Sequence, residues 1–430
     1  MKNLKIFKNS IKYNSSHNSE LFIIKEATAE AYKGLISSLK EKSGNIVSEN
    51  NINGNEFTFL VSEKYNISVG YFPCDGEIRA VFDDAEGNRF PDFSGGGFVP
   101  LNNETKIFQF EVGHSLIDCG MCYIFQCSDN SFILIDSAHS YSINDCDRIH
   151  DFLRERAPDG EKIKISGWFF THGHSDHICQ FTNYLKYCMK DTAIDGLYFN
   201  FVSDSHRDTD EWTQSEKKAR EDFYNTVKAH SEIPVFRMHT GMSVSLKDYK
   251  IDALCCHEDI YPESNEDYND SSLVLMFTAK NTKILIPGDA AVESSRVLER
   301  RYPEYLKSDI VQCSHHGHTG TSCNFYKLVN APTVLIPNTE IKFNEELVRI
   351  EADKVMLSLA ERFYISSNGT VELSIPFDEN KTVVYPDETF ENFNGIYDLW
   401  QYEYTDEFKR KLYHEYLKRG GRPLPEYEKI

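Results

Sequence analysis

The sequence predicts an α/β protein in which several strands end at one functional site. Short apolar runs typical of buried strands alternate with segments of helical spacing over the middle of the 430-residue chain. Carboxylate and imidazole side chains directly follow four of these apolar runs, and α/β folds usually build their sites from residues at the ends of strands. We therefore expect these polar residues to converge on one rim of a sheet.

The length and net charge of the chain argue against several classes of protein. At 430 residues the chain is long enough for two domains plus appendages. Its net charge of −21 argues against a broad nucleic-acid surface and against binding to anionic membranes. No apolar run approaches the roughly 20 residues that cross a bilayer, and the N-terminus lacks the features of a signal peptide. We therefore expect a cytoplasmic protein.

The eleven cysteines are scattered along the chain. Cys119 and Cys122 form a lone Cys-x-x-Cys pair, and no second pair stands at the spacing of a zinc ribbon. The preferred interpretation is that they are mostly buried thiols in a reducing compartment.

Residues 1–104 are predicted to form a separate α+β module. Its expected strands are residues 21–24, 57–61, 67–72 and 77–82, with a helix over 28–39. Asp75 and Gly76 form a hairpin-type turn between the last two strands. A linker near residues 95–97 ends the module. We find no chemistry in this module, so its role stays open.

Residues 105–378 are predicted to form the larger domain. Its expected strands are residues 107–112, 122–126, 132–135, 165–170, 194–201, 234–237, 249–256, 272–277, 283–286, 310–313 and 333–336. Helices are expected over residues 147–156, from His177, from about Ser215 and over 294–301. Strands and helices therefore alternate through most of this domain.

Residues 379–430 form an aromatic tail. Phe408, Leu412 and Tyr416 recur there at the spacing of one helical stripe. Such a stripe usually docks on its own domain or on a partner subunit. A homo-oligomer that forms through this tail or through the N-terminal module is therefore an open expectation.

The segment Thr171–His177, with the sequence Thr-His-Gly-His-Ser-Asp-His, is the most informative in the chain. It places three imidazoles and a carboxylate after an apolar run, and both groups are good ligands for zinc and similar ions. Residues at i and i+2 of an extended segment face the same side, so His172 and His174 can bind one ion. The turn into the next helix can bring Asp176 and His177 toward a second ion. A polar loop with incidental histidines is the alternative.

Three other expected strand ends carry residues of the same kind. Two of them end in a carboxylate, and the third is followed by three histidines; these residues are Asp136, Asp289, His315, His316 and His318. Six of the fifteen histidines therefore lie in two short windows, each after an expected strand.

In these motifs the chain resembles the metallo-β-lactamase superfamily. The resemblance is carried by His172-x-His174-x-Asp176-His177, Pro287-Gly-Asp289 and the late His316-Gly317. The most similar pattern is that of the soluble hydrolase domain of the bacterial competence DNA-uptake channel, matched at Asp136, Asn269–Leu275, Gly288-Asp289 and His315-His-Gly317. The resemblance covers roughly residues 106–375. It implies an αβ/βα sandwich of four layers with a dinuclear metal site.

The resemblance also implies a role for each matched residue. His172 and His174 would bind the first ion, Asp176 and His177 the second, and Asp289 would bridge both. We favour His316 over His315 as a further ligand of the second ion, because His316 directly precedes Gly317. His315 would then face the substrate. Asp136 would lie behind the ligands and orient the segment Thr171–His177, which we call the metal loop.

One ligand of the first ion stays open. Most members of the superfamily supply another histidine shortly before the strand that is expected here at Ser272. The histidine near that place is His257, fifteen residues upstream. Asp270 is the alternative ligand.

The remaining polar residues receive simpler interpretations. His139 and His318 are expected to be polar loop residues rather than catalysts. A solvated loop is also preferred for the insertion that contains His206, Arg207 and Trp212, although related proteins place substrate-covering loops there. The short basic cluster Lys217–Arg220 is expected to be a solvated helix face.

The expected function is hydrolysis by a hydroxide held between two divalent ions, with zinc preferred and manganese or iron as alternatives. Asp176 or a nearby histidine would move the proton. A small phosphodiester is the first choice of substrate, because the most similar pattern belongs to a nuclease-like group and the chain is acidic. A lactone, thioester or amide is the runner-up. The alternative outside the enzymes is a regulatory or assembly protein in which the metal site is structural.

Overall fold

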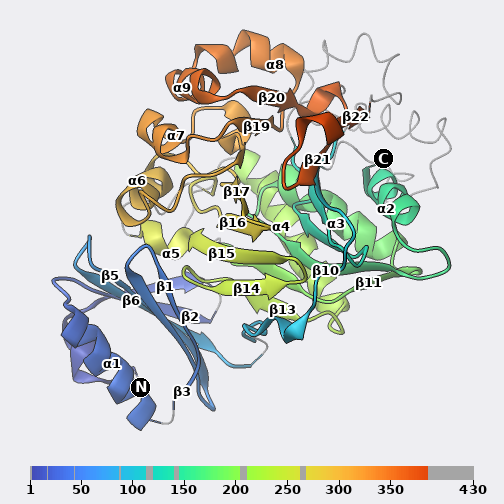
Figure 1. Ribbon diagram of the computed structural model, residues 1–430. Coiled ribbons are helices and arrows are strands. Elements are labelled where there is room, and N and C mark those ends of the chain that lie inside the picture. The colour runs from blue at the N-terminus through green and yellow to red at the C-terminus, as the bar shows by residue number, and fades with distance from the viewer. Residues whose placement is uncertain are drawn as a thin grey trace.

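The structure is a computed structural model with three sheets and the helices that cover them (Figure 1). It describes residues 2–16, 18–42, 44–86, 89–112, 120–139, 145–203, 211–261 and 268–385. The predicted helix with Phe408, Leu412 and Tyr416 lies outside these residues, as does Cys119. None of the helices in the described ranges is long and apolar enough to cross a membrane.

The first sheet forms the N-terminal module. Its six antiparallel strands follow the order β1 (Ile11–Ser16), β2 (Ser19–Ile24), β6 (Glu77–Asp84), β5 (Tyr65–Phe72), β4 (Asn55–Val61) and β3 (Asn45–Ile52). Helix α1 (Ala29–Glu41) buries Leu35 and Leu39 against one face of this sheet. The helix begins where Thr28 Oγ1 accepts a hydrogen bond from the Ala31 N–H at 3.2 Å. The strands and the helix expected in this module are therefore present, together with β1 and β3.

The second sheet begins the larger domain. Its order is β13 (Val235–Arg237), β12 (Leu197–Phe199), β10 (Ile163–Phe169), β9 (Phe132–Ile135), β8 (Tyr123–Gln126), β7 (Thr105–Gln109), β21 (Thr370–Ile375) and β22 (Val383–Tyr385), with β11 (Thr192–Ile194) beside β10. Its outer face is covered by α2 (Asp145–Arg156), α3 (Ser175–Tyr187) and α4 (Glu211–Ala229). Leu153, Phe181 and Phe223 of these helices share one core with Trp168 of β10.

The third sheet runs in the order β14 (Ser243–Leu246), β15 (Tyr249–Cys255), β16 (Val274–Ala279), β17 (Thr282–Ile286), β18 (Ile310–Gln312), β19 (Thr333–Ile336) and β20 (Arg362–Ile365). The helices of this half are α5 (His257–Ile260), α6 (Val292–Arg301), α7 (Cys323–Val329), α8 (Glu340–Glu345) and α9 (Glu351–Leu359). Leu298 of α6, Phe325 of α7 and Met356 of α9 belong to the core of this sheet.

The second and third sheets face each other across one hydrophobic core. The rings of Phe125 (β8) and Phe277 (β16) stack with their centroids 4.3 Å apart, and Phe169 (β10) meets Phe277 edge-on at 6.0 Å. Helices cover the outer face of each of these two sheets. The layers are therefore helix, sheet, sheet and helix, so the expected four-layer αβ/βα sandwich is confirmed.

The predicted single strand over residues 194–201 is wrong in one respect. The structure has two short strands there, β11 and β12, with Asp195 and Gly196 between them. The Phe236 ring occupies the space beside Gly196, where an added Cβ would lie 2.7 Å from Phe236 Cε2. In addition, β22 pairs with β21 beyond residue 378, the predicted end of the domain.

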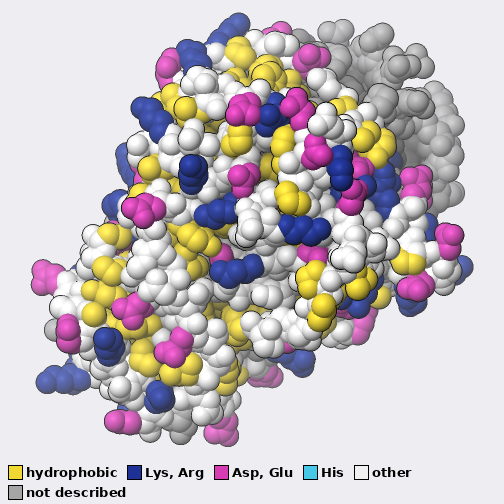
Figure 2. Space-filling view, viewed as in Figure 1, with side chains coloured by type: hydrophobic (Ala, Val, Ile, Leu, Met, Phe, Trp, Pro, Cys, Tyr) yellow, Lys and Arg dark blue, Asp and Glu magenta, His cyan; other side chains and the backbone are white. Residues whose placement is uncertain are grey.

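Basic and acidic side chains are interspersed over the face of the molecule in Figure 2. Among the described residues on that face, no continuous basic area is visible.

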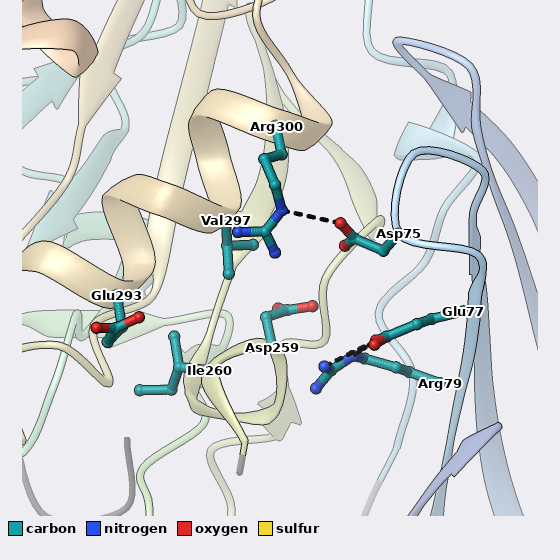
Figure 3. Close-up of a pocket in the computed structure, with 8 residues that line it drawn as sticks. All are labelled: Asp75, Glu77, Arg79, Asp259, Ile260, Glu293, Val297 and Arg300. Atoms are coloured by element: carbon teal, nitrogen blue, oxygen red, sulfur yellow. Dashed lines mark hydrogen bonds and ion pairs between the residues drawn. The ribbon is translucent and has the colours of Figure 1, made fainter. Parts of the chain in front are cut away.

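The N-terminal module contacts the larger domain at α5 and α6. Asp75, in the turn between β5 and β6, faces Arg300 of α6 in Figure 3, with Asp75 Oδ1 2.9 Å from Arg300 Nε. The Arg79 guanidinium donates a hydrogen bond to the Glu258 carbonyl at 2.7 Å. These residues border a pocket of about 160 Å³, lined by Asp75, Glu77, Arg79, Asp259, Ile260, Glu293, Val297 and Arg300. Charged groups of both signs therefore attach the module to the larger domain.

Candidate metal centre

Four strand ends meet at the edge where the second and third sheets adjoin. Asp136 follows β9 and the segment Thr171–His177 follows β10, both in the second sheet. Asp289 follows β17, and His316 follows β18, both in the third sheet. The Leu273 N–H donates to the Thr171 carbonyl at 2.8 Å and joins the two halves at this point.

The backbone at these strand ends adopts an uncommon conformation. Asp136, His315 and His316 have φ angles of 56°, 49° and 54°. Such left-handed backbone is costly for residues other than glycine and often occurs at functional sites. Gly288 has a φ of 61°, and a Cβ there would lie 2.8 Å from Thr171 Cβ. Gly288 therefore lets the strand end that carries Asp289 approach the metal loop.

One group of ligand-type atoms comes from Asp176, His177, Asp289 and His316. One atom from each of these four residues lies within 4.8 Å of the others. His316 Nε2 is 3.1 Å from Asp176 Oδ2, and His177 Nε2 is 3.3 Å from Asp289 Oδ2. Two imidazole nitrogens and two carboxylate oxygens therefore face a common point.

His172 and His174 form a neighbouring group. His172 Nε2 lies 3.1 Å from His174 Nδ1 and 3.6 Å from Asp289 Oδ2. Asp289 thus contacts both groups. Its Oδ1 is buried and has no hydrogen-bond partner among the described residues. A buried carboxylate oxygen in this situation is costly unless a cation or a donor lies beside it.

Hydrogen bonds fix which nitrogen His177 and His316 present. Asp136 Oδ2 accepts from His177 Nδ1 at 2.7 Å, and the Pro337 carbonyl accepts from His316 Nδ1 at 2.9 Å. Each imidazole therefore directs its Nε2 toward the shared point, and hydrogen bonds to the other ring nitrogen usually orient metal-binding histidines in this way. The donor set fits divalent ions such as zinc.

The two groups of histidines also differ in the direction of their pKa shifts. Burial lowers the pKa of His172 well below its usual value and that of His174 to about 3, so both stay neutral, as ligands must. Burial acts in the same direction on His177 and His316, but the Asp289 and Asp176 carboxylates outweigh it. They raise the pKa of His177 well above its usual value and that of His316 to about 10. Positive charge is therefore stabilised at this point.

Asp136 contacts both Thr171 and His177. It is fully buried, and its carboxylate accepts from the Thr171 N–H and Oγ1–H, each at 2.8 Å. With the bond to His177, it connects the start of the metal loop to the start of α3.

The structure does not bring the two candidates for the open position to these groups. His257 Nε2 lies 3.1 Å from Asn200 Oδ1, at the side of the N-terminal module. The Asp270 carboxylate accepts from the backbone N–H groups of Ala291, Glu293 and Ser294, at 3.1, 3.0 and 2.8 Å. Asp270 therefore caps α6 and is already engaged by helix donors.

His315 faces away from the ligand groups. It is half-buried, with Nδ1 3.1 Å from the Thr319 carbonyl and Nε2 3.1 Å from Asn269 Nδ2. His318 Nδ1 lies 3.6 Å from Glu346, and His139 Nε2 lies 3.4 Å from Ser175 Oγ. His206 and Arg207 lie outside the described residues, as does the side chain of Trp212.

Two residues of α4 hold the metal loop and were missed by the sequence analysis. Glu216 accepts hydrogen bonds from the N–H and Oγ–H of Ser175, at 2.7 and 2.8 Å. Arg220 donates to the Gly173 carbonyl at 3.1 Å, and its guanidinium carbon lies 4.0 Å from the Tyr268 ring centroid. These contacts lie on either side of His174.

The expectation of a solvated face for Lys217–Arg220 is therefore wrong for its last residue. Lys217 and Lys218 are exposed, but Arg220 is only 1% exposed. A signal was present in the sequence, because Glu216, Arg220 and the core residue Phe223 share one side of a helix at i, i+4 and i+7. Burial and the nearby Asp176 carboxylate raise the pKa of Glu216 to about 7, although Ser175 donates to it.

Comparison with known proteins finds similarity to solved structures only. No protein-family model matches the sequence, and no curated protein matches it. The metallo-β-lactamase fold protein YhfI from Bacillus subtilis is similar at 11% identity and a TM-score of 0.36, over 61% of this chain and 95% of that chain. Unliganded yeast PDE1 is similar at 13% identity and a TM-score of 0.37, over 61% and 97% of the two chains. Human tRNase Z, short form, is similar at 12% identity and a TM-score of 0.32, over 54% and 90%.

These identities and TM-scores are too low to assign this chain an activity or a substrate. The case for its chemistry rests on its own residues.

Proposed function

We propose that this protein is a member of the metallo-β-lactamase superfamily and a hydrolase that depends on two divalent metal ions. The observation that carries the proposal is the position of Asp289, whose Oδ2 lies 3.6 Å from His172 Nε2 and 3.3 Å from His177 Nε2. A carboxylate between two groups of imidazoles suits a pair of cations. A single structural ion would not need ligands from both groups of imidazoles.

The proposed ligand set has two parts that share Asp289. His172 and His174 would hold one ion, and Asp176, His177 and His316 the other. When bound, such ions polarise the scissile group and make a water molecule acidic enough to attack at neutral pH. Zinc suits the nitrogen and oxygen donors best, and manganese or iron are the alternatives.

The protein's own groups orient the ligands and move protons. Asp136 keeps the Nδ1–H of His177 in place and so keeps its Nε2 available. His315 donates its Nδ1–H to the Thr319 carbonyl and accepts the Asn269 amide N–H at Nε2, so His315 would have to release Asn269 to take a proton from water or substrate. The carboxylate of Asp176 is the second group proposed to carry a proton, because its side chain is 16% exposed whereas that of Asp289 is 2% exposed.

We propose a small phosphodiester as the substrate. Two cations suit the in-line displacement at phosphorus, because they neutralise charge on both the attacking and the leaving oxygen. The net charge of −21 favours a small anion over a long polyanion, because repulsion from the whole surface grows with the length of the polyanion.

A panel of chromogenic phosphodiester, ester, lactone, thioester and β-lactam substrates, run with zinc or manganese added back, tests this proposal. The expected result is phosphodiester turnover in the wild type, none in Asp289→Ala, and unchanged turnover in Asp222→Asn, which alters an exposed carboxylate of α4. Turnover of a lactone or thioester alone would move the substrate to the runner-up class. Bound metal without any turnover would favour the structural-site alternative.

A further inference from the structure

A second group of ligand-type atoms lies at the far end of α3 from the metal centre. Cys146 and Asp147 belong to the first turn of α2, and Cys188 is the residue that ends α3. One ligand atom from each lies within 4.8 Å of the others. The helix between Asp176 and Cys188 separates this group from the centre by about 18 Å, at 1.5 Å per residue.

We propose that Cys146, Asp147 and Cys188 form a separate binding site for one soft divalent cation, with zinc the expected ion. Two thiolates and a carboxylate are a ligand set that zinc prefers. The centre described above has only nitrogen and oxygen donors, so the two sites differ in chemistry. Nothing in this inference depends on the proposed hydrolase activity.

The composition of the group distinguishes it from ordinary core packing. Cys146 and Cys188 are 1% and 4% exposed and border the core between the helices and the second sheet. Two buried thiols alone would be unremarkable, because cysteine behaves as a small apolar residue. Asp147, which is partly exposed, adds a carboxylate within the same 4.8 Å and completes a set of three ligand-type groups.

The start of α2 favours the anionic form of Cys146 and Asp147. Cys146 and Asp147 lie in the first turn of a twelve-residue helix, where backbone N–H groups and the helix dipole stabilise negative charge. Arg148, in the same turn, is paired with Asp145 and Glu111, at 2.5 and 2.6 Å. The Cys188 thiol also lies 3.9 Å from the Cys146 carbonyl, so the two helix ends are already in contact.

An ion at this site would link the start of α2 to the end of α3. Since α3 carries Asp176 and His177 at its other end, the ion would fix this helix without entering the reaction. We therefore expect its loss to lower thermal stability more than turnover.

Cobalt substitution gives a direct test, because a thiolate ligand produces a charge-transfer absorption that nitrogen and oxygen ligands do not. The probe is cobalt(II) added to the full chain after chelator treatment. We expect this absorption in the wild type and in Cys127→Ser, which alters a buried cysteine outside the group. It should also persist in Asp289→Ala, be weakened in Asp147→Asn, and be lost in Cys146→Ser and in Cys188→Ser.

Zinc content gives a second measurement that does not depend on cobalt. Cys146→Ser and Cys188→Ser should each lose one equivalent of zinc relative to Cys127→Ser. If the serine variants fail to fold, Asp147→Asn retains both thiols and the core packing, and its zinc affinity should fall at least tenfold. Absence of the absorption from the wild type, or its persistence in both serine variants, would overturn the proposal. A disulfide between Cys146 and Cys188, seen as the loss of two hydrogens by mass, would also overturn it.

Discussion

His315 and His316 are neighbours in sequence but face different surroundings. His316 is 1% exposed, and its Nε2 lies 3.1 Å from Asp176 and 3.4 Å from Asp289. His315 is half-buried and contacts Asn269 and the Thr319 carbonyl. The left-handed backbone at both residues turns the two side chains apart. Only His316 is therefore placed to bind an ion shared with Asp176.

Two alanine variants separate these roles. His316→Ala should lose most of one metal equivalent, because it removes a nitrogen from the group with Asp176 and His177. His315→Ala should keep both equivalents and lower kcat by about 10²-fold, the usual contribution of a proton-transferring side chain. Metal analysis and steady-state kinetics of the two variants, measured side by side, check this. Metal loss in His315→Ala with retention in His316→Ala would reverse the assignment.

At the scale of elements, α4 holds the segment Thr171–His177, which carries four of the proposed ligands. Arg220 and Glu216 contact Gly173 and Ser175, so the loop is anchored on both sides of His174. An added Cβ at Gly173 would lie 2.7 Å from Arg220 Cδ, which shows how closely helix and loop pack. The position of His174 therefore depends on a helix that supplies no ligand itself.

Arg220→Ala should weaken metal binding by roughly 10–100-fold, the usual effect of removing a group that orients ligands. Arg220→Lys should restore only part of the affinity, because lysine keeps the charge but not the planar guanidinium over Tyr268. Chelator competition measures the affinity, and Lys217→Ala on the exposed side of α4 is the control. An Arg220→Ala affinity equal to that of the control would contradict the proposed anchoring.

The sequence was sufficient to predict elements that carry their own periodicity and a strand-end motif. β9, β10, β17 and β18 were expected within a few residues of their bounds, and the polar residues after them do lie together. These features are local, because a run of four or more apolar residues and the polar residue that follows are read from one short window.

Elements that depend on distant partners could not be predicted. β21 (Thr370–Ile375) pairs with β7 (Thr105–Gln109), some 260 positions earlier, and no local pattern indicates that pairing. The contact of His257 with Asn200 was equally hidden, because the two residues lie 57 positions apart and meet only in the folded protein. The contact of Arg220 with Gly173 likewise joins residues 47 positions apart, although the spacing of Arg220 with Glu216 and Phe223 does indicate the buried side of α4.

At the scale of the whole molecule, a buried ion network joins the N-terminal module to the larger domain. His239 Nε2 lies 2.7 Å from Asp83 of β6, and its Nδ1 lies 2.9 Å from Glu258 of α5. Burial alone would lower the pKa of His239, but the Glu258 and Asp83 carboxylates outweigh it and raise the pKa to about 10. His239 is therefore a cation shared between the two parts.

This network predicts a pH dependence of stability. The histidine pKa is about 6.5 in the unfolded chain, so the contribution of His239 is fully present below that pH and is lost as pH rises toward about 10. His239→Gln should destabilise the protein by about 3–5 kcal/mol near pH 6, because it removes the cation 2.9 Å from buried Glu258, whereas Asp83 keeps Arg237 at 2.8 Å. The difference from wild type should shrink toward pH 10. Denaturant unfolding at several pH values measures it, and a difference that does not change with pH would contradict the network's role.

The acidic surface predicts weak binding to long nucleic acids. At a net charge of −21 the molecule should repel duplex DNA except close to bound cations. A gel-shift assay across salt concentrations should show little or no binding near physiological salt, even if a small phosphodiester is cleaved. Tight binding that weakens steeply with added salt would instead reveal a basic groove and point to a nuclease.

Metal content tests the central claim most directly. The wild-type protein should be expressed with supplemented zinc or manganese, purified without chelators, and compared with Asp289→Ala and the control Asp222→Asn by elemental analysis. To keep the proposed cysteine site from adding to the count, all three are measured in the Cys146→Ser background. We predict close to two equivalents of divalent metal per chain in the parent and in Asp222→Asn, and close to none in Asp289→Ala. Content near zero in the parent, or two equivalents retained in Asp289→Ala, would contradict a dinuclear centre bridged by Asp289.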